Sequence, residues 1–158
     1  MANTQSMCTS FMGELMTATH NFGTAPIRAA TTADTFKAAL YLTSATINAA
    51  TTAYSSTGEV TGTNYTAGGV TVTNATAPIA TNSSATAGVA YWTPSASITY
   101  TTVTLSTAFD CVLIYNSTQS NKAVSVHTFG SQTITAGTFT LTMPSNTTTT
   151  ALLRLSTT

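Results

Sequence analysis

The sequence predicts a mainly β protein, an antiparallel β-sandwich or jelly-roll-like domain with one short N-terminal helix. Thr makes up about a quarter of the 158 residues, and this β-branched residue suits the solvated face of a strand. Roughly eight segments show the alternation or the short apolar runs of strands, with turn residues between them at regular spacing. The length suits a single domain over residues 1–158, and the chain shows no internal repeat of fixed period.

The N-terminal residues 1–22 are predicted to be a helical docking segment. Residues 6–19 hold the helix, because Met7, Phe11 and Leu15 recur at the four-residue spacing of one helix face. A helix of this length is unstable alone, so its apolar stripe must pack on the sheet or on a neighbouring subunit. We therefore predict that Met7, Phe11 and Leu15 lie at an interface.

The first half of the β region alternates long strands and loops. A loop over residues 23–33 precedes residues 36–47, whose alternating apolar side chains predict a long strand covered on both faces. The Gly68-Gly69 pair predicts a turn that leads into a strand at residues 70–73. Residues 74–88 carry almost no large side chain and exceed the usual length of a connection. They are predicted to be a long flexible loop, or an arm ordered by contact with a neighbour.

The second half contains the most apolar strand. Residues 98–105 are predicted to form a strand whose apolar phase shifts between Tyr100 and Val103, which a β-bulge or burial on both faces would explain. The continuous apolar run Cys111–Tyr115 is typical of a central strand buried on both faces. A turn cluster then leads to Lys122–Val126, the expected hairpin partner of that strand.

The remaining strands lie near the C-terminus of the sequence. Residues 132–135 and 138–143 are predicted to pair with each other across a hairpin turn at Ala136-Gly137. Residues 144–150 form a polar loop, and residues 151–155 are predicted to be the final strand.

The charge content is unusually low and favours a protein that works in an assembly. Charged residues make up 5% of the chain, and the formal net charge is +0. Soluble proteins typically contain about 25% charged residues. With so little charge, electrostatic repulsion hardly opposes self-association. The alternative is a soluble monomer that hydroxyl groups alone keep in solution.

The same composition argues against two classes of partner. The basic residues are single and scattered along the sequence, so no patch could neutralise a phosphate backbone, and we expect no nucleic acid partner. No apolar run approaches the roughly 18 residues of a membrane helix, and we expect no membrane partner. Two of the basic residues, Arg28 and Arg154, are instead predicted to be interface contacts.

The cysteines and the N-terminal residues favour a reducing compartment. Residues 1–7 lack the basic start and the apolar run of a secretory signal. Cys8 and Cys111 are too few for a disulfide framework or a cysteine-based zinc site. Cys111 is predicted to be a small buried apolar residue.

The sequence offers little material for catalysis. His20 and His127 are the only histidines. A Ser-His-acid site would need one of the four acids to orient a histidine: Glu14, Asp34, Glu59 or Asp110. The chain has neither a nucleophile elbow nor a glycine-rich phosphate loop. We expect no catalytic residue, no metal site and no cofactor, and we expect His20 to close the helix end by a hydrogen bond.

Several motifs are spread over most of the chain: Cys8–Met16, His20–Phe22, Asp34–Tyr41, Ser44–Thr46, Thr51–Tyr54, Glu59–Gly69, Ile114–Asn116 and Phe129-Gly130. In these motifs the chain resembles a family of small virion-associated proteins of tailed bacteriophages, with a gap in residues 74–88. The chain departs from the family at Met12, where a basic residue is common. The shared motifs are structural, so the resemblance implies a virion protein without assigning its place in the particle.

The first functional hypothesis is a capsid cement, or decoration, protein. It would be a non-enzymatic structural protein, a homotrimer on the outer capsid surface of the virion, assembled in the cytoplasm of the bacterial host. Its partner would be the major capsid protein, whose contacts it would stabilise. The alternative is a tail-, neck- or fibre-associated virion protein that serves as an adaptor or receptor-binding module. A third hypothesis, a lectin-like domain, would use Trp92, Tyr91 and Tyr54 to stack on sugars.

Overall fold

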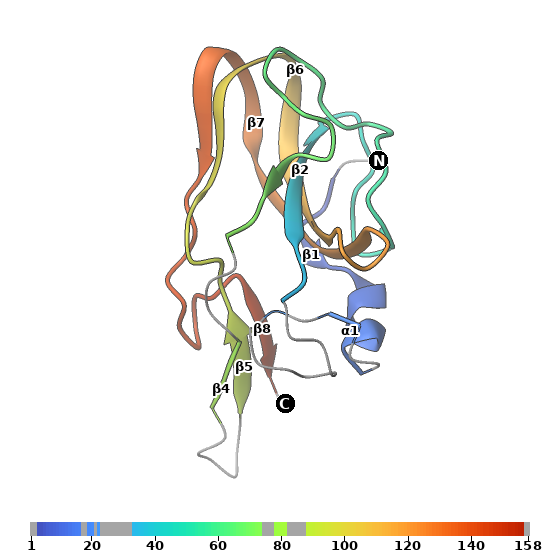
Figure 1. Ribbon diagram of the computed structural model, residues 1–158, viewed down its shortest axis with the longest axis vertical. Coiled ribbons are helices and arrows are strands. Elements are labelled where there is room, and N and C mark those ends of the chain that lie inside the picture. Colours follow the sequence, from blue (N-terminus) through green and yellow to red (C-terminus); the bar gives the residue numbers. More distant parts are fainter. Residues whose placement is uncertain are drawn as a thin grey trace.

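The part of the chain that the structure describes folds into two antiparallel β-sheets and one short helix. The computed structural model describes residues 3–16, 19–20, 22, 33–73, 78–81 and 88–156. A five-stranded sheet has the order β1-β7-β6-β2-β3, and a three-stranded sheet has the order β4-β5-β8. The elements are β1 (Ser6–Met7), α1 (Thr9–Met16), β2 (Phe36–Leu42), β3 (Val70–Thr71), β4 (Ile79–Thr81), β5 (Val89–Trp92), β6 (Ile98–Asn116), β7 (Lys122–Leu141) and β8 (Leu153–Ser156). Figure 1 shows the two sheets toward opposite ends of the long axis, and α1 lies near the level where they meet.

The long hairpin of β6 and β7 is the framework of the larger sheet. These strands have 19 and 20 residues and pair from Asn116 and Lys122 at the turn to Ile98 and Leu141 at the far end. The predicted hairpin between residues 116 and 122 is confirmed. Its strands are much longer than the sequence indicates, because β-bulges let each strand continue through positions that look like breaks.

The predicted hairpin at Ala136-Gly137 is wrong, because both of its arms belong to β7. Ala136 has a φ of 45°, and the ladder slips by one residue on β7 between the pairs Val103–Gly137 and Leu105–Ile134. A left-handed residue beside a glycine thus marks a bulge here. Of the two explanations for the phase shift between Tyr100 and Val103, the bulge is the one observed, and Thr102 within it has a φ of 51°.

The core lies on β6 and its neighbour β2. Residues 111–116 of β6 are all buried, which confirms the prediction of a central strand covered on both faces and of a buried Cys111. β2 pairs with β6 on one side and β3 on the other. The prediction of a strand over residues 36–47 is wrong beyond Leu42, where the Ala45 amide donates to the Leu42 carbonyl at 2.9 Å and closes a turn.

Glu59 holds in place the loop that connects β2 to β3. Its buried carboxylate accepts hydrogen bonds from the Tyr54 and Tyr65 hydroxyls at 2.6 and 2.7 Å and from the Gly68 amide at 2.8 Å. The Tyr65 hydroxyl also accepts from the Leu40 amide of β2 at 3.0 Å. Burial, followed by the hydrogen bond to Glu59, raises the pKa of Tyr65 above its usual range. A single carboxylate therefore fixes two tyrosines and the predicted Gly68-Gly69 turn.

Three short elements differ from the sequence prediction. The helix is shorter than residues 6–19, since Ser6 and Met7 form β1 and pair with β7, and Thr19 lies outside α1. The strand predicted at residues 70–73 ends at Thr71. Ile79–Thr81, inside the predicted loop, pair with β5 as β4. The other residues of the predicted 74–88 loop lie outside the described residues, except Pro78 and Gly88, and so does the predicted 23–33 loop, except Ala33.

Candidate functional site

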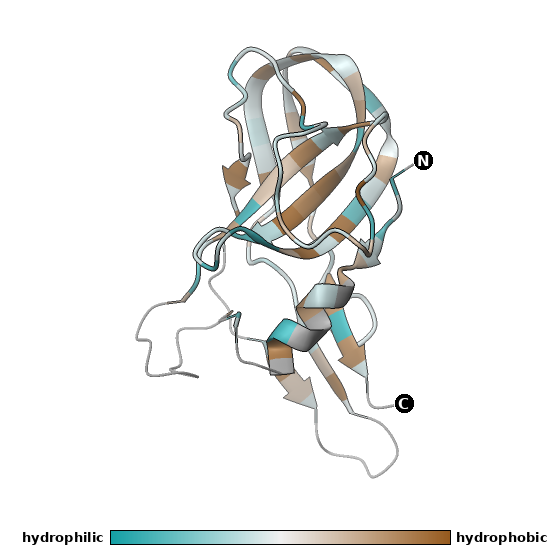
Figure 2. Cartoon of the chain, turned by 90° about the vertical axis from the view of Figure 1, so that its right-hand side faces the viewer, coloured by the Kyte–Doolittle hydropathy of each residue, from teal (hydrophilic) through white to brown (hydrophobic). Residues whose placement is uncertain are grey.

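An apolar groove lies between α1 and the three-stranded sheet. Its volume is about 90 Å³, and its lining is hydrophobic and aromatic. One wall carries Met7 of β1 with Phe11 and Leu15 of α1, and the other wall carries Tyr91 of β5 and Leu155 of β8. In Figure 2, α1 lies directly beside the strands of the smaller sheet, which carry brown hydrophobic segments. We call this feature the apolar groove.

The rim of the apolar groove is more apolar than an ordinary surface. Leu155 on the edge strand β8 lines the groove and is 40% exposed, whereas Ile79 on the opposite edge strand β4 is 44% exposed but does not line it. These two are the large hydrophobic residues that lie exposed in the part of the chain that the structure describes. Large apolar side chains on strand edges next to a groove are typical of an interaction surface.

The structure brings most of the predicted interface residues together. Met7, Phe11 and Leu15 all line the apolar groove, although Met7 belongs to β1 and not to the helix. Arg154 is exposed on β8 and lines a second hollow of about 480 Å³, which Met7 also borders. Arg28 lies outside the described residues. The interface role of these residues stays a prediction.

Sequence reasoning missed the sheet side of the apolar groove. Tyr91, Leu153 and Leu155 lie on short strands whose meeting with α1 depends on the tertiary fold. The alternation of Leu153 and Leu155 is a local signal of a one-sided strand, but it does not show which partner that side faces. Phe22, Trp92 and Pro78 complete the lining.

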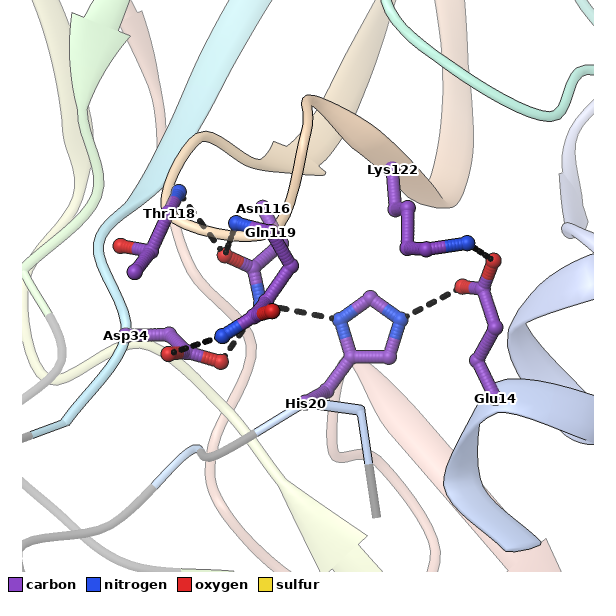
Figure 3. A network of polar contacts seen from close by, with 7 residues as sticks. All are labelled: Glu14, His20, Asp34, Asn116, Thr118, Gln119 and Lys122. Carbon is purple, nitrogen blue, oxygen red and sulfur yellow. Dashed lines mark hydrogen bonds and ion pairs between the residues drawn. The ribbon is translucent and has the colours of Figure 1, made fainter. Parts of the chain in front are cut away.

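A polar cluster ties α1 to the turn between β6 and β7 (Figure 3). The Nε2 atom of His20 lies 2.7 Å from Oε2 of Glu14, and Oε1 of Glu14 accepts from Nζ of Lys122 at 2.6 Å. On the other side of the ring, Nδ1 of His20 lies 3.0 Å from Nδ2 of Asn116. Asn116 also donates to Asp34 at 2.8 Å. We call Glu14, His20, Asn116 and Lys122 the His20 clasp.

Aromatic side chains connect the His20 clasp to the apolar groove. The Phe11 ring packs edge-on against His20 with centroids 4.8 Å apart. Phe22 stacks on Phe36 at 4.5 Å and meets Trp92 edge-on at 4.8 Å. Phe11, Phe22 and Trp92 line the groove as well, so a displacement of His20 would be transmitted to its floor.

Burial and hydrogen bonding set the ionisation of the clasp. His20 is buried, and this burial lowers its pKa, although Glu14 and Asp34 act in the opposite direction. Burial alone would raise the pKa of Glu14, but hydrogen bonds from Lys122 and His20 outweigh it and leave the pKa lowered. The clasp therefore joins a neutral imidazole to an ionised carboxylate near neutral pH.

The hydrogen bond expected of His20 at the helix end is made to the side chain of Glu14, in the last turn of α1. The two ring nitrogens of His20 contact the side chains of Glu14 and Asn116. Both nitrogens are engaged, so the ring acts as a link between α1 and the β6–β7 turn.

The other histidine and the remaining acids lie apart from one another. His127 contacts the Ser125 hydroxyl at 2.9 Å, and burial lowers its pKa to about 4. No acid within the described ranges hydrogen-bonds to His127, since Glu59 binds tyrosines and Asp110 accepts from Asn3 at 2.6 Å. Among the described residues, no group of three or more His, Cys, Asp or Glu side chains could hold a metal ion.

The aromatic residues considered for sugar stacking do not form a shared platform. Trp92 is 2% exposed and packs inside the aromatic cluster. Tyr54 stacks on Tyr115 at 4.7 Å, and its hydroxyl donates to Glu59. A sugar ring would need an open aromatic face, and the buried Trp92 offers none.

Comparison with known proteins gives no match from which a function could be inferred. No family model, curated protein or solved structure matches the chain. In the described segments, no helix combines the length and the apolar character that crossing a bilayer requires.

Proposed function

We propose that the protein is a non-enzymatic structural virion protein, a capsid cement or decoration protein with a jelly-roll-like β domain. It binds the outer shell of a bacteriophage capsid and stabilises contacts between major capsid proteins. The observation that carries the proposal is the apolar groove, where Met7, Phe11 and Leu15 meet the exposed Leu155 of an edge strand.

The surface chemistry supports a role in an assembly. Four threonines of β7, Thr133, Thr135, Thr138 and Thr140, are exposed and present hydroxyl groups where most soluble proteins carry charge. A surface of this kind is hydrated without strong long-range repulsion. It therefore allows many identical copies to lie close together on one shell.

The acids contribute little to the outer surface. Glu14 pairs with Lys122 and His20, Asp34 binds Asn116, and Glu59 is buried beneath tyrosines. These carboxylates are used inside the molecule. The partner surface is accordingly expected to be apolar and weakly charged, as a groove without a charged lining requires.

The mechanism is the burial of a modest apolar area, repeated over many copies. Each Å² of apolar surface removed from water contributes about 25 cal/mol. One site is therefore weak, but a homotrimer presents three equivalent sites, and attachment of one raises the local concentration of the others. A small domain can thus hold neighbouring capsid proteins together.

The test is binding of the Leu155→Asp variant to purified capsid shells that lack the protein. The change places a charge at the rim of the apolar groove, and we expect at least about tenfold weaker binding, since a buried unpaired charge costs more than 1.4 kcal/mol. Thr138→Asp is the matched control, because it adds the same charge to an exposed strand residue that does not line the groove.

Equal binding of the two variants would show that the groove does not face the shell. If the wild-type protein does not bind shells but binds purified tails, the tail- or fibre-associated alternative is correct. Circular dichroism of both variants checks that the fold is retained.

A further inference from the structure

We propose that the His20 clasp is an acid-released latch: protonation of His20 breaks its contact with Asn116 and frees His20 from the turn between β6 and β7. The inference goes beyond the proposed function and does not depend on it. It rests on which atoms of the cluster can donate and which can accept a hydrogen bond.

The orientation of the Asn116 amide is fixed by its partners. Oδ1 accepts hydrogen bonds from the backbone amides of Thr118 and Gln119, each at 3.1 Å, and a backbone amide can only donate. Nδ2 donates to the carboxylate of Asp34 at 2.8 Å. A flip of the amide would lose all three hydrogen bonds and would place a carbonyl against a carboxylate. Asn116 therefore presents its NH₂ group to His20.

This orientation determines the tautomer of His20. Nδ1 lies 3.0 Å from a donor, so it must carry the lone pair and accept. The ring proton is then on Nε2, where it donates to Glu14 at 2.7 Å. The neutral ring satisfies both partners (Figure 3). An imidazolium would carry a second proton on Nδ1 that points at the NH₂ group of Asn116, with no acceptor in reach of it on Asn116.

Charged groups reach His20 from three elements. Glu14 faces it from α1, Asp34 from the segment before β2, and Lys122 from β7. The two carboxylates favour the imidazolium, whereas Lys122 opposes it. The rings of Phe11, Phe22 and Phe36 also pack around His20 and shield it from water. Burial is the largest effect and keeps the pKa of His20 below the ordinary value of 6.5.

The sign of the pH effect follows from this lowered pKa. A released His20 in water has an ordinary pKa, so it binds a proton more readily than the closed state does. Closure is therefore fully favoured above about pH 6.5 and is lost as the pH falls toward the pKa of the closed state. Within that window, the ratio of released to closed molecules rises by up to about tenfold per pH unit.

Release would open the apolar groove from its α1 side. Phe11 precedes His20 and packs on its ring, and Phe22 follows two residues later and packs on Trp92. Outward movement of His20 thus separates Phe22 from Trp92. Because Trp92 is the only tryptophan, its fluorescence reports on this movement.

The first test is the tautomer of His20, read from long-range ¹H–¹⁵N NMR spectra of the wild-type protein at neutral pH. The chain has two histidines, so the His127→Gln variant assigns both ring signals. We expect His20 as the Nε2–H tautomer. An Nδ1–H tautomer would overturn the proposal, because the ring would then not require a donor from Asn116.

The second test is acid titration followed by Trp92 emission and by the His20 ring signals. We expect a red shift of the emission with a midpoint below pH 6.5 that coincides with protonation of His20, while far-UV circular dichroism keeps its strand signal. The His127→Gln variant should show the same transition. Protonation of His20 without a change in Trp92 emission would contradict the latch.

The Glu14→Gln variant separates His20 from Glu14 as the trigger. If His20 is the trigger, the transition persists and its midpoint moves to higher pH, because loss of the carboxylate weakens the closed clasp and lowers the pKa of His20 in the closed state further, so that protonation favours release more strongly. If the transition disappears, protonation of Glu14 is the cause and the proposal is wrong.

Discussion

At Gly69 the chain turns into β3 in direct contact with the backbone of β2. The residue has a φ of +69°, and a Cβ atom built there would lie 1.7 Å from the Ala38 carbonyl oxygen. Tyr100 donates to the same carbonyl at 2.8 Å, and Tyr115 donates to the Gly68 carbonyl at 2.8 Å. These contacts hold the loop after Glu59 tightly against the core, so the position accepts only glycine.

The Gly69→Ala substitution is therefore expected to destabilise the protein. The left-handed backbone alone costs about 1–3 kcal/mol for a residue with a side chain, and the contact with Ala38 adds to it. The measurement is the free energy of unfolding from urea denaturation. Gly130→Ala is the matched control, since nothing lies within 4 Å of the added Cβ atom there. Equal losses in the two variants would contradict the role assigned to Gly69.

At the scale of elements, local signals predicted the centre of the larger sheet and failed at its irregular parts. The run Cys111–Tyr115 and the turn after it are encoded by neighbouring residues, and both predictions are confirmed. The continuity of β6 and β7 depends on bulges that a partner strand stabilises, so alanine and glycine at positions 136 and 137 look like a turn in the sequence. The short strand β1 likewise exists only through pairing with a distant segment, β7.

The candidate site likewise combines features that neighbouring residues encode with features that depend on the tertiary fold. The four-residue spacing that links Phe11 and Leu15 is visible in the sequence, and both residues line the apolar groove. The His20 clasp joins residues up to 108 positions apart, between Glu14 and Lys122, and no spacing in the sequence indicates it. Its components could be recognised only as polar residues of unusual burial, a property that the fold alone reveals.

Deletion of residues 1–16 tests whether the N-terminal elements dock on an independent β framework. It removes β1 and α1, which are an edge strand and a helix outside the pairing of β2, β6 and β7. We expect the far-UV circular dichroism of strands to remain, with a lower Tm because Phe22 and Trp92 lose the cover of Phe11. Attachment to shells should be lost with the groove. Loss of the strand signal would show that the N-terminal elements are part of the folding unit.

At the scale of the whole molecule, the carboxylates bind partners inside the fold, whereas the exposed large apolar side chains lie at one end. Carboxylates are used within the fold, as in the Glu59 and His20 contacts, and exposed threonines cover the free part of β7. The exposed apolar side chains Ile79 and Leu155 lie instead on the smaller sheet, and Leu155 lines the apolar groove. Figure 1 places this sheet at one end of the long axis, so a partner would meet the molecule end-on.

The most direct test of the cement proposal is the copy number of the protein in purified virions. Quantitative mass spectrometry gives its amount relative to the major capsid protein. We predict a ratio near one to one, because a cement protein covers the whole shell with equivalent sites. A ratio of a small fraction would instead place the protein at the tail or fibres. Its absence from virions would contradict the structural role altogether.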